Sequence, residues 1–121
     1  MLGLGTEHTY YYYLSPVDMR KGFDGLSGLV SEHLEKEQGK KIVYAFINKK
    51  KDKLKLLHWQ AGGFVLYYKR LEKGIFELPK YDIEEGLIVL SYTEMVMILD
   101  GISILNLTRK ERYLSNKNVE N

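Results

Sequence analysis

Apolar and polar side chains alternate along several short segments of the chain, which is the pattern of β-strands. Residues 8–14 (HTYYYYL) are β-branched and aromatic, and predict a strand whose four tyrosines point alternately to opposite faces. Aromatic residues in strands usually pack, so we expect core positions for them, with base stacking as the alternative. Residues 41–47 (KIVYAFI) are apolar on both faces from Ile42 onward. This predicts a central strand covered on both sides.

Two further strands are predicted around a tight turn. Residues 53–60 and 64–71 flank Ala61-Gly62-Gly63, a sequence suited to a β-hairpin. A second turn is expected at Glu72-Lys73-Gly74, where glycine suits a positive φ. The remaining predicted strands are short and cover residues 75–78 and 87–90.

Two segments carry helical patterns instead. In the first, apolar residues recur at spacings of three and four: Met19, Phe23, Leu26 and Val30. Since Ser15-Pro16-Val17-Asp18 has the features of a helix start, a long helix is predicted over residues 16–38. Ser91-Tyr92-Thr93-Glu94 resembles a capping box and predicts a short helix that stops at Gly101. Residues 92–99 are almost wholly apolar, so this helix is expected to be buried or to form a homo-oligomer interface.

These elements predict a single α+β domain over residues 1–108. We expect an antiparallel sheet of four to six strands, a meander of hairpins, packed by one long N-terminal helix and one short C-terminal helix. A chain of 121 residues is long enough to bury one ordinary core. Residues 109–121 lack an apolar pattern and are expected to form a polar, flexible tail.

Composition narrows the chemistry that the chain can perform. There is no cysteine, which excludes disulfides, thiolate zinc sites and a cysteine nucleophile. His8, His33 and His58 are scattered without metal-ligand spacing, so no metal or cofactor is expected. The N-terminus lacks a secretion signal and no apolar run approaches the roughly 18–20 residues that span a bilayer. We therefore expect a cytoplasmic protein with no membrane partner.

The positive charge of the chain is concentrated in its middle. Ten Lys and Arg against two acids between residues 40 and 73 give +8, whereas the whole chain carries a formal net charge of +2. Charge separated in this way favours a polyanionic partner. Lysine greatly outnumbers arginine, and lysine acts as a point charge, so contacts with a nucleic-acid backbone are expected rather than reading of base edges.

The hairpin register decides which residues share a surface. If Trp59 pairs with Phe64, then Lys55 lies opposite Tyr68 and Lys53 opposite Arg70. One face then presents cationic and aromatic groups together, which suits a nucleic-acid strand. A one-residue shift would bring a different set to this face: Val65, Tyr67, Lys69 and Leu71. The lysines could instead protect a solvated sheet edge from aggregation, or meet an acidic protein.

Three motifs point to a family. Residues 18–26 read DMRKGFDGL, residues 54–59 and 63–76 contain a tryptophan followed by G-F-x-L-x-x-K-R-L-E-x-G-x-F, and residues 99–102 read L-x-G-I. In this order they resemble the small accessory protein of IS sixty-six-type insertion sequences, the TnpB or Orf2-like family, which is distinct from the RNA-guided nuclease also called TnpB. The match covers about residues 10–104. Its key positions are Asp18, Met19, Arg20, Lys21, Gly22, Phe23, Asp24, Gly25, Trp59, Gly63, Lys69, Arg70, Leu71, Glu72 and Gly74.

The resemblance implies a role in bacterial DNA transposition beside a separate, larger transposase, with no established catalytic residues or cofactor. Together with the basic middle, it predicts a non-enzymatic accessory factor that contacts DNA, either transposon ends or non-specific DNA, and is nucleoid-associated when bound. The expected contact residues are Arg20, Lys21, Lys49, Lys50, Lys51, Lys53, Lys55, Trp59, Tyr68, Lys69, Arg70 and Lys73.

Two alternatives remain. The chain could be an adaptor that docks onto the transposase through its acidic flank or its apolar helix at 92–99. A metal-dependent nuclease is disfavoured, because such an enzyme needs carboxylates that converge on metal ions about 3.5–4 Å apart. The candidates within the motifs are Asp18, Asp24 and Asp100, and the first two are better explained by helix capping and by a solvated helix position.

Overall fold

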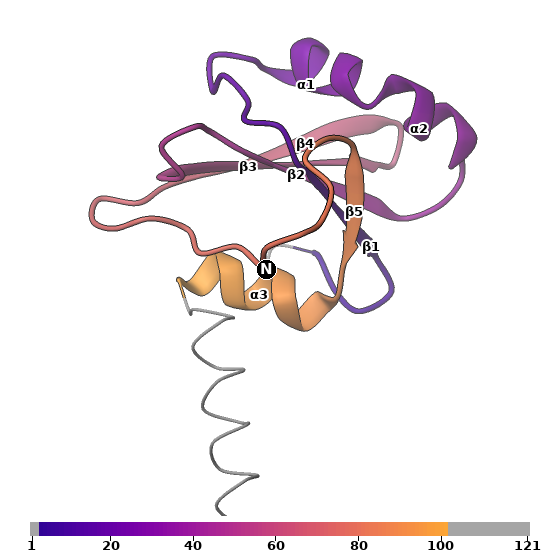
Figure 1. The fold of residues 1–121 in the computed structure, drawn as a ribbon. Coiled ribbons are helices and arrows are strands. Elements are labelled where there is room, and N and C mark those ends of the chain that lie inside the picture. Colours follow the sequence, from indigo (N-terminus) through magenta and orange to yellow (C-terminus); the bar gives the residue numbers. More distant parts are fainter. Residues whose placement is uncertain (1–2, 102–121) are drawn as a thin grey trace, which may run out of the picture.

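A computed structural model describes residues 3–101, which build one sheet with helices on both of its faces (Figure 1). Among these residues the strands are β1 (Thr9–Tyr13), β2 (Ile42–Ile47), β3 (Lys53–Gln60), β4 (Gly63–Arg70) and β5 (Leu87–Leu90). The helices are α1 (Phe23–Leu29), α2 (Ser31–Lys36) and α3 (Tyr92–Asp100). The spatial order of the strands is β4-β3-β2-β1-β5. The fold is therefore a single small α+β domain, as predicted.

The sheet is mixed, so the prediction of a purely antiparallel meander was wrong. β1 pairs with β2 in parallel, with Tyr10 beside Val43, whereas the other neighbouring pairs are antiparallel. The chain between β1 and β2 carries α1 and α2 across one face of the sheet (Figure 1). A helical crossover of this length lets the second strand return in the same direction as the first.

The prediction of one long helix over residues 16–38 was also wrong. Residues 16–22 are not helical, and the Val17 N–H donates at 2.9 Å to the carbonyl of Ile47, the last residue of β2. Helix α1 begins only at Phe23, and Val30, with φ −120° and ψ 15°, separates it from α2. The apolar spacing still identified buried residues, since Leu26 and Val30 are in the core. Periodicity located the inward face, and tertiary contacts decided where the backbone was helical.

The core has two layers, one on each face of the sheet. The layer beneath α1 and α2 includes Leu26, Tyr44 and Phe46, and the layer beneath α3 includes Tyr10 and Met95. All six residues of β2 are buried, which confirms the prediction of a central strand. The tyrosines of β1 also pack into the two layers alternately, as expected for core aromatics.

The predicted β3–β4 hairpin is confirmed, and of the two registers considered the structure has the one that pairs Trp59 with Phe64. The predicted strand at 75–78 is wrong, since this segment has no strand structure. Instead, the Phe76 N–H donates to the Lys51 carbonyl at 2.7 Å and the Phe76 side chain is fully buried. Gly74 adopts the expected positive φ, 78°. The turn therefore sends the chain into the core rather than into another strand.

The short C-terminal helix begins and ends as predicted. Ser91 and Glu94 form a reciprocal capping box, and Gly101 is left-handed with φ 77°. Met95, Ile98 and Leu99 are buried against the chain's own sheet (Figure 1). Most of the apolar surface that suggested a homo-oligomer is thus covered within one chain, and an oligomer through 92–99 stays a prediction. Within residues 3–101 no helix combines the length and apolar character required to cross a bilayer. The predicted tail at 109–121 lies outside the described residues.

Candidate nucleic-acid interface

The face of the β3–β4 hairpin that lies toward α1 and α2 carries the residues that the register of Trp59 with Phe64 brings together. Lys53 pairs with Arg70 and Lys55 with Tyr68 at one end of the strands. Trp59 pairs with Phe64 at the other end. We call this surface the hairpin face. Its two ends border different grooves.

A basic groove lies at the Lys53 end, with a volume of about 590 Å³. Its cationic lining residues are Arg20, Lys49, Lys50 and Lys53, and the other lining residues are Pro16, Val17, Asp18, Met19, Asn48 and Tyr68. Asp18 is the acidic residue of this lining. The groove therefore joins the first motif, through residues 18–20, to the second motif, through Tyr68.

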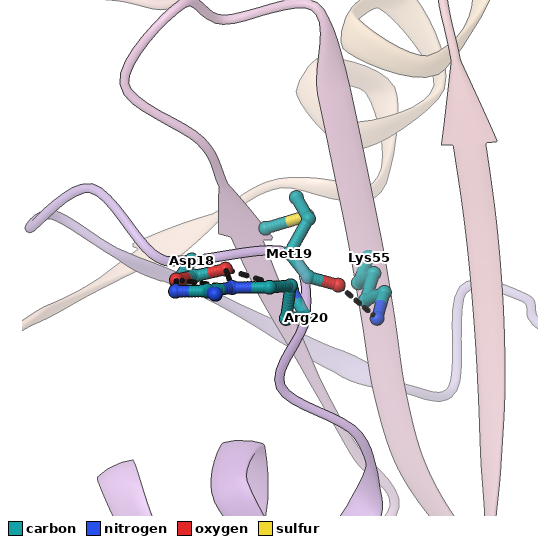
Figure 2. A network of polar contacts seen from close by, with 4 residues as sticks. All are labelled: Asp18, Met19, Arg20 and Lys55. Carbon is teal, nitrogen blue, oxygen red and sulfur yellow. Dashed lines mark hydrogen bonds and ion pairs between the residues drawn. The ribbon is translucent and has the colours of Figure 1, made fainter.

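Lys55 holds the two motifs together from beneath this groove. It is only 6% exposed, and its Nζ donates to the Met19 carbonyl at 2.7 Å and to the Lys21 carbonyl at 2.8 Å. Figure 2 shows the first of these bonds, beside the Asp18–Arg20 pair. The same ammonium lies 4.7 Å from the centre of the Tyr68 ring, within cation–π range. The ammonium is therefore bound by groups of the protein itself.

Asp18 and Arg20 form a tight local pair on the loop before α1 (Figure 2). The Arg20 Nη2 donates to Asp18 Oδ2 at 2.6 Å, and the Arg20 backbone N–H donates to Oδ1 at 2.9 Å. These hydrogen bonds, the side-chain one above all, lower the pKa of Asp18 to about 2. The proposed helix-capping role of Asp18 is wrong, because it closes a turn instead. The Arg20 side chain remains 92% exposed.

Three lysines project from a turn that side-chain hydrogen bonds make rigid. Asn48 Nδ2 donates to Asp52 Oδ1 at 2.6 Å, and Asn48 Oδ1 accepts from the Asp52 and Lys53 N–H groups. The bond from Asn48 is the largest influence that lowers the pKa of Asp52. The exposed lysines of this turn are Lys49, Lys50 and Lys51. Because these hydrogen bonds join the two ends of the turn, its backbone holds the three lysines at defined positions.

The remaining predicted contact residues are not all at this groove. Lys21 and Lys73 are exposed, and Arg70 is exposed but paired with Glu72 at 2.9 Å. The Lys69 ammonium donates to the Leu99 carbonyl at the end of α3, on the other face of the sheet. Trp59 lies at the opposite end of the hairpin from the basic groove. The sequence did not show that Lys55 and Lys69 donate to fixed carbonyl groups, because those carbonyls belong to residues far away along the chain.

A second groove lies at the Trp59 end, with a volume of about 630 Å³. We call it the apolar groove, and its lining residues are Asp24, Ser27, Gly28, Ser31, Leu34, Glu35, Glu37, Gln38, Gly39, Lys40, Trp59 and Phe64. The Trp59 and Phe64 rings meet edge to face with centroids 5.0 Å apart. The sequence feature that pointed to it was the single Trp59, but nothing in the sequence joined this residue to residues 24–40.

The carboxylates considered for nuclease chemistry are dispersed over the fold. Asp18 is paired at the basic groove, Asp24 lines the apolar groove, and Asp100 ends α3 on the opposite face. Among residues 3–101, no group of three or more histidines or acidic residues is placed to share a metal ion. His58 is buried in β3, as expected for a strand histidine, and desolvation lowers its pKa.

Comparison with known proteins identifies the family. Residues 8–109 match the family described as IS66 Orf2 like protein. A curated relative, uncharacterized protein y4jC of Sinorhizobium fredii (strain NBRC 101917 / NGR234), is 30% identical over 95 residues, which cover 78% of this chain and 80% of the relative. No solved structure is significantly similar to this chain. The chain therefore belongs to the IS66 Orf2-like family, which associates it with an insertion sequence as an accessory protein.

Proposed function

We propose that this protein is a non-enzymatic accessory factor in DNA transposition that binds the DNA backbone through the basic groove. The observation that carries the proposal is the gathering of Arg20, Lys49, Lys50 and Lys53 around one groove that both long family motifs line. A cluster of cations attracts phosphates and gains affinity by releasing their counterions. The exposed ring of Tyr68, at 50% exposure, could stack on a base beside them.

The proposed contact surface is narrower than the sequence suggested. Lys55 and Lys69 already donate to backbone carbonyls, so their ammonium groups are committed to the fold. Trp59 belongs to the apolar groove. The direct contacts that remain are Arg20, Lys21, Lys49, Lys50, Lys51, Lys53, Tyr68, Arg70 and Lys73.

Fluorescence anisotropy of labelled duplex and single-stranded DNA over a salt series tests this proposal. Neutralising roughly six phosphates predicts a slope of log K against log salt near −5 on duplex DNA. Replacing Lys49, Lys50 and Lys51 together by glutamine should bring the slope to about −2 to −3 and weaken binding at low salt by tenfold or more, since roughly three phosphate contacts are lost.

A matched control removes the same charge elsewhere. Lys36, Lys41 and Lys80 are exposed residues outside the basic groove, so their combined replacement by glutamine should leave the slope nearly unchanged. Equal effects of the two triple variants would mean that net charge, and not this groove, attracts DNA. Absence of binding at low salt would remove the proposal.

A second candidate function is that of an adaptor that docks onto the transposase. The apolar groove favours it, because Trp59 is 51% exposed there without belonging to the cationic surface. Co-purification with the transposase that survives replacement of Lys49, Lys50 and Lys51 by glutamate would support this function. Its loss in that variant would assign the association to the basic turn instead.

A further inference from the structure

The apolar groove has the shape and surface of a site for an apolar side chain. It runs between α1–α2 and the tip of the β3–β4 hairpin, and Trp59, Phe64 and Leu34 contribute its apolar lining. Gly28 lies on its α1 side, and a Cβ added there would meet no heavy atom within 4 Å. The groove is thus open where a side chain would otherwise fill it. Exposed aromatic surface in a concavity is typical of binding sites.

Acidic groups surround this apolar surface. Asp24, Glu35 and Glu37 line the groove, against one lining cation, Lys40. Lys40 is paired with Glu37 at 2.6 Å, and its hydrogen bond is the largest influence that lowers the pKa of Glu37. Within residues 3–101, Asp24 and Glu35 make no ion pair. The groove therefore offers two uncompensated carboxylates beside an exposed tryptophan.

We propose that the apolar groove binds a segment of a partner protein in which an apolar side chain is flanked by lysine or arginine. The apolar side chain would lie between Gly28 and Trp59, and the flanking cations would approach Asp24 and Glu35. Nucleic acid does not fit this site, because carboxylates repel phosphates and the cations of the hairpin face lie at its other end. The inference is independent of DNA binding at the basic groove.

Trp59 supplies the readout, because it is the sole tryptophan of the chain. The probes are three short synthetic peptides without tryptophan: one of alternating leucine and arginine, one with each arginine replaced by glutamate, and one with each leucine replaced by serine. The leucine–arginine peptide should shift the Trp59 emission to shorter wavelength in a saturable manner as the ring leaves water. The other two should bind at least about tenfold more weakly, since one lacks the cations and the other lacks the apolar side chains.

Two sets of variants of the full chain locate the binding. Gly28→Leu fills the groove and should weaken the leucine–arginine peptide at least about tenfold, the loss expected when a central anchoring contact is removed. Gly22→Leu is its control, because Gly22 is equally open but lies outside the groove lining. Asp24→Asn with Glu35→Gln should weaken binding and reduce its dependence on salt. Thermal unfolding followed by circular dichroism verifies that each variant is folded.

Three results would overturn the proposal. One is equal binding of the leucine–arginine and leucine–glutamate peptides. Another is a Gly28→Leu variant that is folded and binds the peptide as well as Gly22→Leu does. A third is a change of Trp59 emission, in the absence of peptide, when residues 109–121 are deleted, because the occupant would then be the chain's own basic segment. DNA anisotropy of Gly28→Leu, which changes no charge, should be unchanged, so failure here is distinguishable from failure of the DNA-binding proposal.

Discussion

Lys55 is the residue that connects the two long family motifs in space. A buried ammonium is tolerated when its N–H groups find hydrogen-bond acceptors. The Lys55 ammonium donates to two carbonyls and lies over the Tyr68 ring. The two carbonyls belong to Met19 and Lys21, so the loop before α1 takes its position from this side chain. Lys55, which its charge predicted to contact DNA, therefore has a structural role.

Replacing Lys55 by methionine should destabilise the protein by about 1–3 kcal/mol, because two carbonyls lose a charged donor while the apolar stem is kept. Urea unfolding measures the change. Lys53→Met is the matched control, since Lys53 lies on the same face of β3 and is more exposed. Similar losses in the two variants would show that the hydrogen bonds of Lys55 contribute little.

The Asp18–Arg20 pair makes a pH-dependent prediction. Hydrogen bonds from Arg20 lower the pKa of Asp18 from 3.8 to about 2. A lowered folded-state pKa adds stability that is present above 3.8 and lost as pH falls through about 2. NMR titration of the Asp18 carboxyl should therefore give a midpoint near 2, and Arg20→Gln should return it toward the ordinary value. The same midpoint in both proteins would contradict this account of the pair.

At the scale of elements, the β3–β4 hairpin and helix α3 are specified by local signals. Ala61 and Gly62 have positive φ values of 47° and 86°, which suit a two-residue hairpin turn. Such a turn sets the register that places cations at one end of the hairpin face and aromatic rings at the other. Helix α3 depends in a similar way on the residue that precedes it, because Ser91 and Glu94 satisfy each other's backbone N–H groups.

Ser91→Ala should lower stability by about 1 kcal/mol, since the capping hydroxyl no longer accepts from the Glu94 N–H. Thermal unfolding monitored by circular dichroism would show the loss as a lower midpoint. Thr93→Ala is a suitable comparison, because Thr93 is exposed on the same helix turn but is not the capping residue. If both alanine variants unfolded at the same temperature, the capping box would not be a source of stability.

At the scale of the whole molecule, charge is separated along a single sheet face. The cations of the Lys49–Lys51 turn and Arg20 lie at one end of the hairpin face, and Asp24 and Glu35 lie with Trp59 at the other. α3 and its core layer cover the opposite face (Figure 1). The sites proposed for DNA and for a basic protein segment are therefore separate, and each has the charge opposite to that of its ligand. The two proposals can therefore be tested separately, with variants at opposite ends of the hairpin face.

The sequence by itself determined the strands around the hairpin, the all-buried β2 and the capped helix α3, whereas it left two hairpin registers open. Each rests on side-chain alternation or on turn and capping residues that act within a few positions of the chain. The basic turn at residues 49–51 was visible for the same reason. Family membership also came from the sequence, because its motifs are collinear stretches.

Only the tertiary structure decided the parallel pairing of β1 with β2, the break at Val30 and the loop at residues 16–22. The bond from Val17 to Ile47 joins residues far apart in the chain, and it competes with the helix that local spacing favoured. The partners of Lys55 and Lys69 are likewise at least thirty residues away. The apolar groove is formed by the crossover helices and the hairpin, and the basic groove by the loop at residues 16–20, the turn at residues 48–50 and the hairpin. Contacts of this kind depend on how the elements pack, and the packing of distant elements cannot be predicted from a local pattern of residues.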